Sequence, residues 1–174
     1  MVGAHNLVRG AVDVYRHLAD LPRPAQLLFV CGKDERLRQV ITQLAQEASR
    51  LVRVFGYVND IPAFMAMSDL MITKAGWVTT SEALAAELPM VLINPIPGQE
   101  EENTAFLQAV DAAIVAPRPA ALPSLIADLL DHPERLARLR AGARRVKRPE
   151  AMAHAAEAIL ALAPVQALCG IEEG

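Results

Sequence analysis

Short apolar runs alternate with longer segments of helical periodicity along most of the chain. Residues 7–18 place apolar side chains at helical spacing, and the prolines at 22 and 24 end this predicted helix. Residues 25–31 then read AQLLFVC, a run short and apolar enough for a buried parallel strand. A second helix, capped by Asp34, is predicted to about residue 50, and a second strand over 51–55.

The same alternation continues in the second part of the chain. It predicts strands at 70–73, 90–93 and 112–115, and helices at 63–67, 80–86, 101–109, 122–131, 133–145 and 149–162. Strands that alternate with helices in this way are typical of an α/β fold with a Rossmann-like, doubly wound parallel sheet. We therefore predict one domain over residues 1–163 and a flexible tail over residues 164–174.

The predicted fold lacks one element at its start. A Rossmann-like half normally opens with a strand that runs into its first glycine-rich loop, whereas this sequence opens almost directly on a helix. We therefore expect the first strand to be missing, as in a natural fragment, a split subunit or a chain cut at a domain boundary. An exposed apolar edge at the place of that strand would favour assembly with another segment.

Composition and charge narrow the possible partners. The chain is 53% hydrophobic but only 4% aromatic, which indicates an aliphatic core, and its net charge of −3 argues against non-specific binding to nucleic acid. A basic run over residues 135–148 is either a solvated helix face or a site of peripheral membrane contact, and we favour the solvated face. Neither Cys31 nor Cys169 has a spacing that predicts a metal site or a nucleophile, and without a signal peptide we expect a cytoplasmic location.

Candidate chemistry follows the predicted strands, because ligands of open parallel sheets bind at the carboxyl ends of the strands. The loop over residues 73–82 reads TKAGWVTTSE and places Gly76 before Thr79 and Thr80 at a predicted helix start, which suits an anion such as a diphosphate. Glu82 is able to accept hydrogen bonds from a ribose diol. The alternative is a plain capping box formed by Thr79 and Glu82.

A second candidate loop over residues 94–103 reads NPIPGQEEEN, in which two prolines stiffen the backbone before a row of amides and carboxylates. Such groups bind sugar hydroxyls through paired hydrogen bonds, and we favour Gln99, Glu100 and Asn103 for this role. A solvated acidic helix start is the alternative, and it suits Glu101 and Glu102 better. The third loop, at residues 32–34, offers Lys33 to a phosphate.

These loops resemble the monogalactosyldiacylglycerol synthases and processive diacylglycerol glucosyltransferases, relatives of the peptidoglycan glycosyltransferase MurG. The resemblance spans most of the chain and rests on VCGKDERL, FGYVNDIPAFMAMSDLMITKAG, TTSEALAAELPMVLINPIPGQEEEN and LLDHPERLARLR. It implies the C-terminal, donor-binding half of a GT-B glycosyltransferase, in which two Rossmann-like domains face a cleft. Trp77 and Val78 depart from the small, glycine-containing step that the family usually has there.

The resemblance also implies roles for single residues. Val58 is expected beside the uracil of a UDP-sugar, Gly76 and Thr79 at the diphosphate, and Glu82 at the ribose. Gln99, Glu100 and Asn103 are expected to face the donor sugar. The remaining candidates, a remnant of the first phosphate loop and a basic contact, are Gly3, His5, Asn6 and Lys33.

The implied reaction is inverting transfer of a hexose from UDP to a lipid acceptor such as diacylglycerol, with no cofactor beyond the donor substrate and no bound metal. None of the four histidines matches the family's catalytic base, so we expect a missing N-terminal domain or a partner chain to supply it and the acceptor, at the inner face of the membrane. One alternative is a UDP-sugar 2-epimerase, which would epimerise the sugar without an acceptor. Another is a nucleotide-sugar-binding module or split-enzyme subunit without activity alone.

Overall fold

The computed structural model describes residues 4–19, 21–47, 51–93, 98 and 100–162. Its first half alternates helices with strands: α1 (Ala4–Ala19), β1 (Leu27–Val30), α2 (Glu35–Gln46), β2 (Val52–Phe55), α3 (Ile61–Ala66), β3 (Met71–Thr73) and α4 (Trp77–Ala85). The second half contains β4 (Met90–Ile93), α5 (Glu101–Ala109), β5 (Ala113–Ala116), the 3-10 turn η1 (Pro119–Ala121), α6 (Leu122–Asp131), α7 (Pro133–Val146) and α8 (Ala151–Leu162). The predicted strands and long helices are confirmed to within a few residues.

The strands form two parallel sheets. In the first, β1 pairs with β2, with Leu27 opposite Val52; in the second, the order is β3-β4-β5, with Met71 opposite Met90. Every pairing is parallel, so the carboxyl ends within each sheet lie at one edge. The predicted parallel α/β fold is therefore confirmed, with the strands divided between two sheets where one had been expected.

Helices cover both faces of the β3-β4-β5 sheet, because successive side chains of β4 point to opposite faces and pack against different helices. Met90 and Leu92 pack in one apolar cluster with residues of α4, α5 and α7, whereas Val91 packs in another with residues of α1, α6 and α7. Because Met90, Val91 and Leu92 are all fully buried, β4 is the centre of the core. This two-sided cover explains the continuous apolar run in the sequence and confirms the doubly wound arrangement.

Two turns at helix C-termini use an acidic residue where glycine is common. Glu87 follows α4 with a φ of 54°, and Asp111 follows α5 with a φ of 55°. After each of them, the next residue, Leu88 or Ala112, donates its N–H to the carbonyl five positions earlier, at 2.9 Å. This is the Schellman arrangement, which turns the chain directly from helix into strand. A side chain in this left-handed conformation costs on the order of 1 kcal/mol relative to glycine. The use of an acidic residue instead of glycine at both turns therefore needs a structural explanation.

The explanation lies in basic residues of α7 and in Lys147 directly after this helix, which bind both turns. Arg144 Nη2 and Lys147 Nζ donate to the Glu87 carboxylate at 2.7 and 2.6 Å. Arg138 Nη2 donates to both carboxylate oxygens of Asp111 at 3.0 Å. The basic run that the sequence offers as a candidate for membrane contact therefore holds α7 against the ends of α4 and α5.

Helix α7 lies closest to the turn after α5 at Gly142, a buried residue inside the helix. A Cβ atom at this position would lie 2.2 Å from the carbonyl oxygen of Asp111 and 2.4 Å from that of Val110. Such a separation is far inside van der Waals contact, so only glycine allows α7 to lie this close to the turn after α5.

The ion pairs of Glu87 predict a particular pH dependence of stability. Hydrogen bonds from Arg144 and Lys147 lower the pKa of Glu87 from 4.5 to about 2. Because this folded-state pKa lies below the unfolded value, the contribution is complete above about pH 4.5 and is lost as the pH falls toward about 2. We expect Glu87→Gln to lower the melting temperature at neutral pH, and the difference from the unchanged chain to shrink between these two pH values.

Thermal unfolding followed by circular dichroism from about pH 5 down to about pH 2.5 measures this effect. Glu157→Gln on exposed α8 is the matched control and is expected to leave the melting temperature unchanged. A Glu87→Gln difference that stays constant over the whole range would contradict the assignment of the ion pairs.

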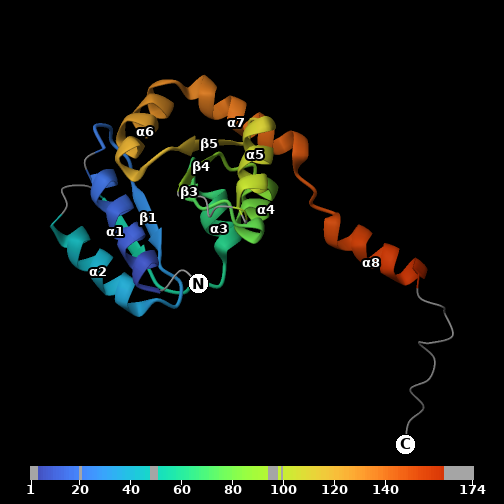
Figure 1. The fold of residues 1–174 in the computed structure, drawn as a ribbon, viewed down its shortest axis with the longest axis horizontal. Coiled ribbons are helices and arrows are strands. Elements are labelled where there is room, and N and C mark those ends of the chain that lie inside the picture. Colours follow the sequence, from blue (N-terminus) through green and yellow to red (C-terminus); the bar gives the residue numbers. More distant parts are fainter. Residues whose placement is uncertain (1–3, 20, 48–50, 94–97, 99, 163–174) are drawn as a thin grey trace, which may run out of the picture.

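The last described helix is set apart from the others. Figure 1 shows α8 extending away from the packed elements, and each of its residues is exposed. Met152 and Leu162 are among its large apolar side chains. The tail predicted over residues 164–174 lies outside the described residues.

Candidate functional site

The loop after β1 lies beside the loop after β2. Gly32 has a φ of 60°, a left-handed value that turns the chain sharply at the end of the strand, and the Asp34 carboxylate then accepts from Leu37 N at 2.9 Å to cap α2. Between them, Lys33 places its ammonium group 5.3 Å from the centroid of the Tyr57 ring. This cation–π contact brings Lys33 to the turn that contains Val58.

The predicted nucleobase contact belongs to that turn. Val58 is half-buried, whereas Tyr57 is 64% exposed despite the contact of its ring with Lys33. The exposed aromatic face and the neighbouring backbone lie directly after the carboxyl end of β2. A flat, heteroaromatic ligand would find both a stacking surface and backbone hydrogen-bonding groups here.

The loop after β3 differs from its prediction, because α4 begins three residues early. Gly76 is the residue before the helix, with a φ of −70° and no side-chain cap, and Trp77 is the first helical residue. The predicted helix start at residue 80 is therefore wrong, and the alternative of a capping box between Thr79 and Glu82 is excluded. Thr79 and Thr80 lie inside the helix, where the buried Thr80 hydroxyl donates to the Gly76 carbonyl at 2.9 Å.

The early start of α4 exposes a helix N-terminus to solvent. The first N–H groups of a helix have no acceptor within it, and the bond from Thr80 N to Gly76 O, at 3.0 Å, is the first of this helix. A Cβ atom at Gly76 would meet nothing within 4 Å, so a ligand has room to approach the backbone there. Glu82 follows Thr79 by three positions and is exposed on the same side of α4.

The helix after β4 is tied to the loop after β3 by Asn103. Its Nδ2 donates to the carbonyl oxygen of Ala75 at 2.8 Å, and the residue is only 3% exposed. Glu100, directly before α5, is also buried, and its carbonyl accepts from the Thr104 hydroxyl at 2.7 Å. The amide that the sequence assigns to sugar recognition thus has a structural bond that joins the two candidate loops.

The candidate residues form two groups. Lys33 and Val58 belong to the loops of the β1-β2 sheet. The other group follows the strands of the β3-β4-β5 sheet and consists of Gly76, Thr79, Thr80, Glu82, Glu100 and Asn103. Residues 5 and 6 lie in the first turn of α1, and their side chains lie outside the described part of the chain, as do Gly3 and Gln99.

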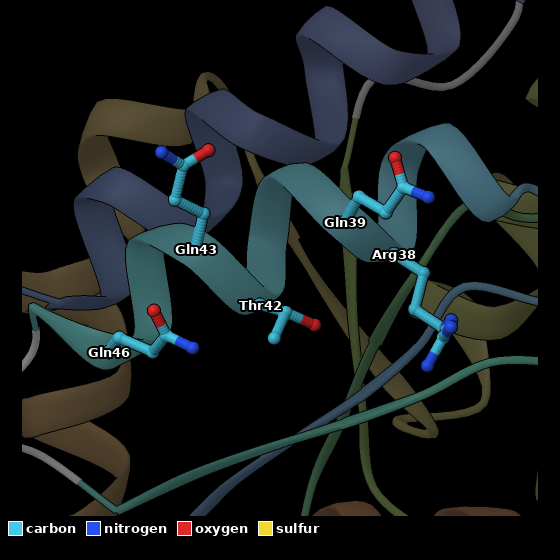
Figure 2. Close-up of a pocket in the computed structure, with 5 residues that line it drawn as sticks. All are labelled: Arg38, Gln39, Thr42, Gln43 and Gln46. Carbon is cyan, nitrogen blue, oxygen red and sulfur yellow. The ribbon is translucent and has the colours of Figure 1, made fainter.

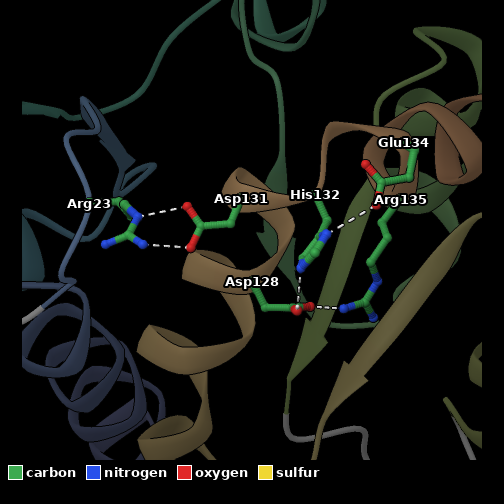
Figure 3. Close-up of polar contacts among 6 residues, drawn as sticks. All are labelled: Arg23, Asp128, Asp131, His132, Glu134 and Arg135. Atoms are coloured by element: carbon green, nitrogen blue, oxygen red, sulfur yellow. Dashed lines mark hydrogen bonds and ion pairs between the residues drawn. The ribbon is translucent and has the colours of Figure 1, made fainter.

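Histidines with described side chains lie away from these loops. His17 is near the end of α1 and His154 is exposed on α8. His132 stands at the corner between α6 and α7, where its Nδ1 is 3.1 Å from Glu134 Oε1 (Figure 3). In the same view Arg135 pairs with Asp128, and Arg23 forms a bidentate pair with Asp131 at 2.6 and 2.7 Å. This corner is a network of structural contacts.

Among the described residues, the remaining candidates for reactive or metal-binding groups form no further site. Cys31 is buried directly after β1, and burial raises the pKa of its thiol, so this cysteine packs as a small apolar residue. Within the described ranges, no three His, Cys, Asp or Glu side chains gather as metal ligands would. No helix of these ranges combines the length and the apolar character that crossing a membrane requires.

Two surface hollows lie apart from the candidate loops. One, of about 230 Å³, is lined only by polar and charged side chains of α2, which Figure 2 shows along one helix: Arg38, Gln39, Thr42, Gln43 and Gln46. The other, of about 800 Å³, is lined by residues 21–26 and Leu51, which precede β1 and β2. It therefore lies at the amino ends of these strands, opposite the end where ligands of parallel sheets bind.

Comparison with known proteins gives a consistent result. The family model of the glycosyl transferases group 1 matches residues 1–146. The processive diacylglycerol beta-glucosyltransferases of Bacillus cytotoxicus and Bacillus mycoides are each 32% identical to this chain, over 92% of its length and 41% of theirs. The chain thus spans less than half the length of these relatives.

A solved structure shows the same fold. The crystal structure of Acinetobacter baumannii MurG, a GT-B enzyme, superposes with a TM-score of 0.74 at 23% identity, covering 91% of this chain and 47% of MurG. The parallel α/β architecture thus matches that of a GT-B glycosyltransferase structure. Because the family model extends over most of the sequence, the chain belongs to the glycosyl transferases group 1 family.

Proposed function

We propose that this chain is the donor-binding half of a glycosyltransferase that transfers a hexose from UDP to a lipid acceptor such as diacylglycerol, with inversion at the anomeric carbon. The observation that carries the proposal is the similarity to processive diacylglycerol beta-glucosyltransferases, which are 32% identical over an alignment that covers 92% of this chain. The open helix N-terminus at Gly76 and the exposed Glu82 behind it provide the chemistry that a nucleoside diphosphate requires.

The proposed donor pose follows the order of the loops. The uracil lies at Tyr57 and Val58, the ribose at Glu82, and the diphosphate at the first turn of α4. There the helix dipole and backbone N–H groups stabilise the leaving UDP as negative charge develops on it. The sugar faces the loop before α5, with Gln99, Glu100 and Asn103 at its hydroxyl groups. No cofactor beyond the UDP-sugar is required.

We further propose that the catalytic base and the acceptor site come from a segment outside this chain. His17, His132 and His154 all lie away from the strand ends, which supports this division of labour. The base would deprotonate the acceptor hydroxyl, which attacks the anomeric carbon while UDP leaves. A lipid acceptor also implies that the complete enzyme works at a membrane surface, for which the cytoplasmic face is our proposal.

Calorimetric titration with UDP, UDP-glucose, UDP-galactose and UDP-N-acetylglucosamine tests the donor site and ranks the sugars. We expect saturable binding of UDP that Glu82→Ala weakens at least about tenfold, because a carboxylate that accepts from a diol contributes on the order of 1.5 to 3 kcal/mol. Glu157→Ala on α8 is the control and is expected to bind as the unchanged chain does. Equal affinity of the Glu82 variant would refute the proposed ribose contact.

A further inference from the structure

The most exposed aromatic side chains of this protein lie at the carboxyl ends of its strands. The sequence contains four phenylalanines, two tyrosines and one tryptophan. Tyr57, in the turn after β2, is 64% exposed, and Trp77, the first residue of α4 after β3, is 65% exposed. Phe106 on α5 is 44% exposed, and the other aromatic residues are buried or half-buried. Because ligands of parallel sheets bind at these strand ends, a ligand there would cover both exposed rings.

The backbone that carries Trp77 is held firmly. Ala75, two positions earlier, is fully buried, and its carbonyl accepts from Asn103 Nδ2 at 2.8 Å, which ties this loop to α5. Gly76 follows as the residue before the helix, and no side chain caps the helix start. Trp77 and Val78 then leave most of their apolar surface in water, which gains nothing for folding. The indole is therefore presented to solvent from a fixed position.

Trp77 belongs to the turn at which we propose that the diphosphate binds. The N–H groups of the first helical residues have no acceptor within a helix, and in α4 the first internal bond is donated by Thr80. The N–H groups of Trp77 and Val78 are thus among those available to an anion. Because the hexose is bonded directly to the terminal phosphate of the donor, its ring comes within reach of the indole. The uracil, proposed at Tyr57, is a separate contact.

We propose that the indole of Trp77 packs against the donor hexose, so that Trp77 contributes to the affinity for UDP-hexoses and not to the affinity for UDP. The inference rests on the proposed donor site and adds a specificity-determining contact to it. One face of a hexopyranose ring carries mainly C–H groups, for which a large aromatic ring is a complementary surface. The hydroxyl groups at the rim of the sugar stay available to the polar loop before α5. Aromatic walls with a few polar groups are usual in ligand sites.

The only tryptophan of the sequence makes intrinsic fluorescence a readout of this one contact. We expect UDP-glucose to shift the tryptophan emission of the 174-residue chain to shorter wavelength, because the sugar displaces water from the indole, and UDP to shift it less. In calorimetric titrations, Trp77→Ala is expected to weaken UDP-glucose binding at least about threefold and UDP binding less than about twofold. Trp77→Phe keeps an aromatic face and is expected to restore most of the lost affinity.

Phe106→Ala, which removes the exposed ring on α5, is the control and is expected to leave both affinities unchanged. Loss of UDP-glucose affinity with UDP affinity retained supports the contact. Equal weakening of both ligands by Trp77→Ala would overturn it, because the residue would then act on the diphosphate turn alone. Unchanged binding of both ligands would also overturn it, while the donor site stands. A folded chain without substitutions that binds neither ligand would overturn the donor site and this contact together.

Discussion

Replacing Gly142 with alanine is expected to lower the free energy of unfolding by about 2 kcal/mol or more, although alanine is the better helix former by about 1 kcal/mol. The reason is the approach of α7 to the turn after α5, where the new Cβ would lie 2.2 Å from the carbonyl oxygen of Asp111. Backbone atoms form the opposing surface, so no side-chain rotation relieves the clash. The helix must shift, which also strains the ion pairs of Glu87 and Asp111.

A second helical glycine provides a control of opposite sign. Gly10 lies in α1, and a Cβ there would meet nothing within 4 Å. We therefore expect Gly10→Ala to stabilise the chain by about 0.5 to 1 kcal/mol. Urea denaturation of both variants measures the difference. A Gly142→Ala variant as stable as Gly10→Ala would show that α7 does not pack as closely as described.

Asn103→Asp is expected to destabilise the chain by about 2 to 4 kcal/mol. The two side chains have nearly the same shape, but aspartate removes the donor to the Ala75 carbonyl and places a carboxylate oxygen against it in a buried position. The exposed Asn59 supplies a matched control, and Asn59→Asp is expected to change stability by less than about 0.5 kcal/mol.

This substitution also separates two roles of Asn103. If its amide mainly joins the loops after β3 and β4, urea denaturation of the free chain reveals the loss without any ligand. If Asn103 acts only as a contact of the donor sugar, stability stays unchanged and only the affinity for UDP-sugars falls. A destabilised variant that retains its UDP affinity would assign the residue to the frame of the site.

Much of the fold is encoded in local patterns. The run from Met90 to Ile93 predicts a buried strand because it is apolar on both faces, and Asp34 predicts the start of α2 because its carboxylate caps the helix. The start of α4 is different. Thr79 and Glu82 have the spacing of a capping box, yet the helix begins at Trp77, because the run after Gly76 continues the helix without a capping side chain.

Features that depend on distant contacts are not visible in the sequence. Glu87 and Asp111 occupy turn positions at which glycine is the usual signal, and their arginine and lysine partners are 27 to 60 positions away. A glycine inside the basic helix α7 hints at close packing, but its neighbour at Asp111 becomes evident only in three dimensions. The division of the strands into two sheets likewise depends on which strands pair, with no pairing between β1 and β3 in the described part of the chain, and local patterns do not report this.

The account rests on a UDP-sugar site at the carboxyl ends of the strands, and an NMR titration of the isotope-labelled chain with UDP tests it most directly. We predict that amide resonances shift at Val58, Gly76, Thr79 and Glu82, and that those of residues 21–26, at the opposite ends of the strands, stay in place. Shifts confined to residues 21–26, or saturation with UDP that leaves the loops after β2 and β3 unchanged, would contradict the proposed donor site.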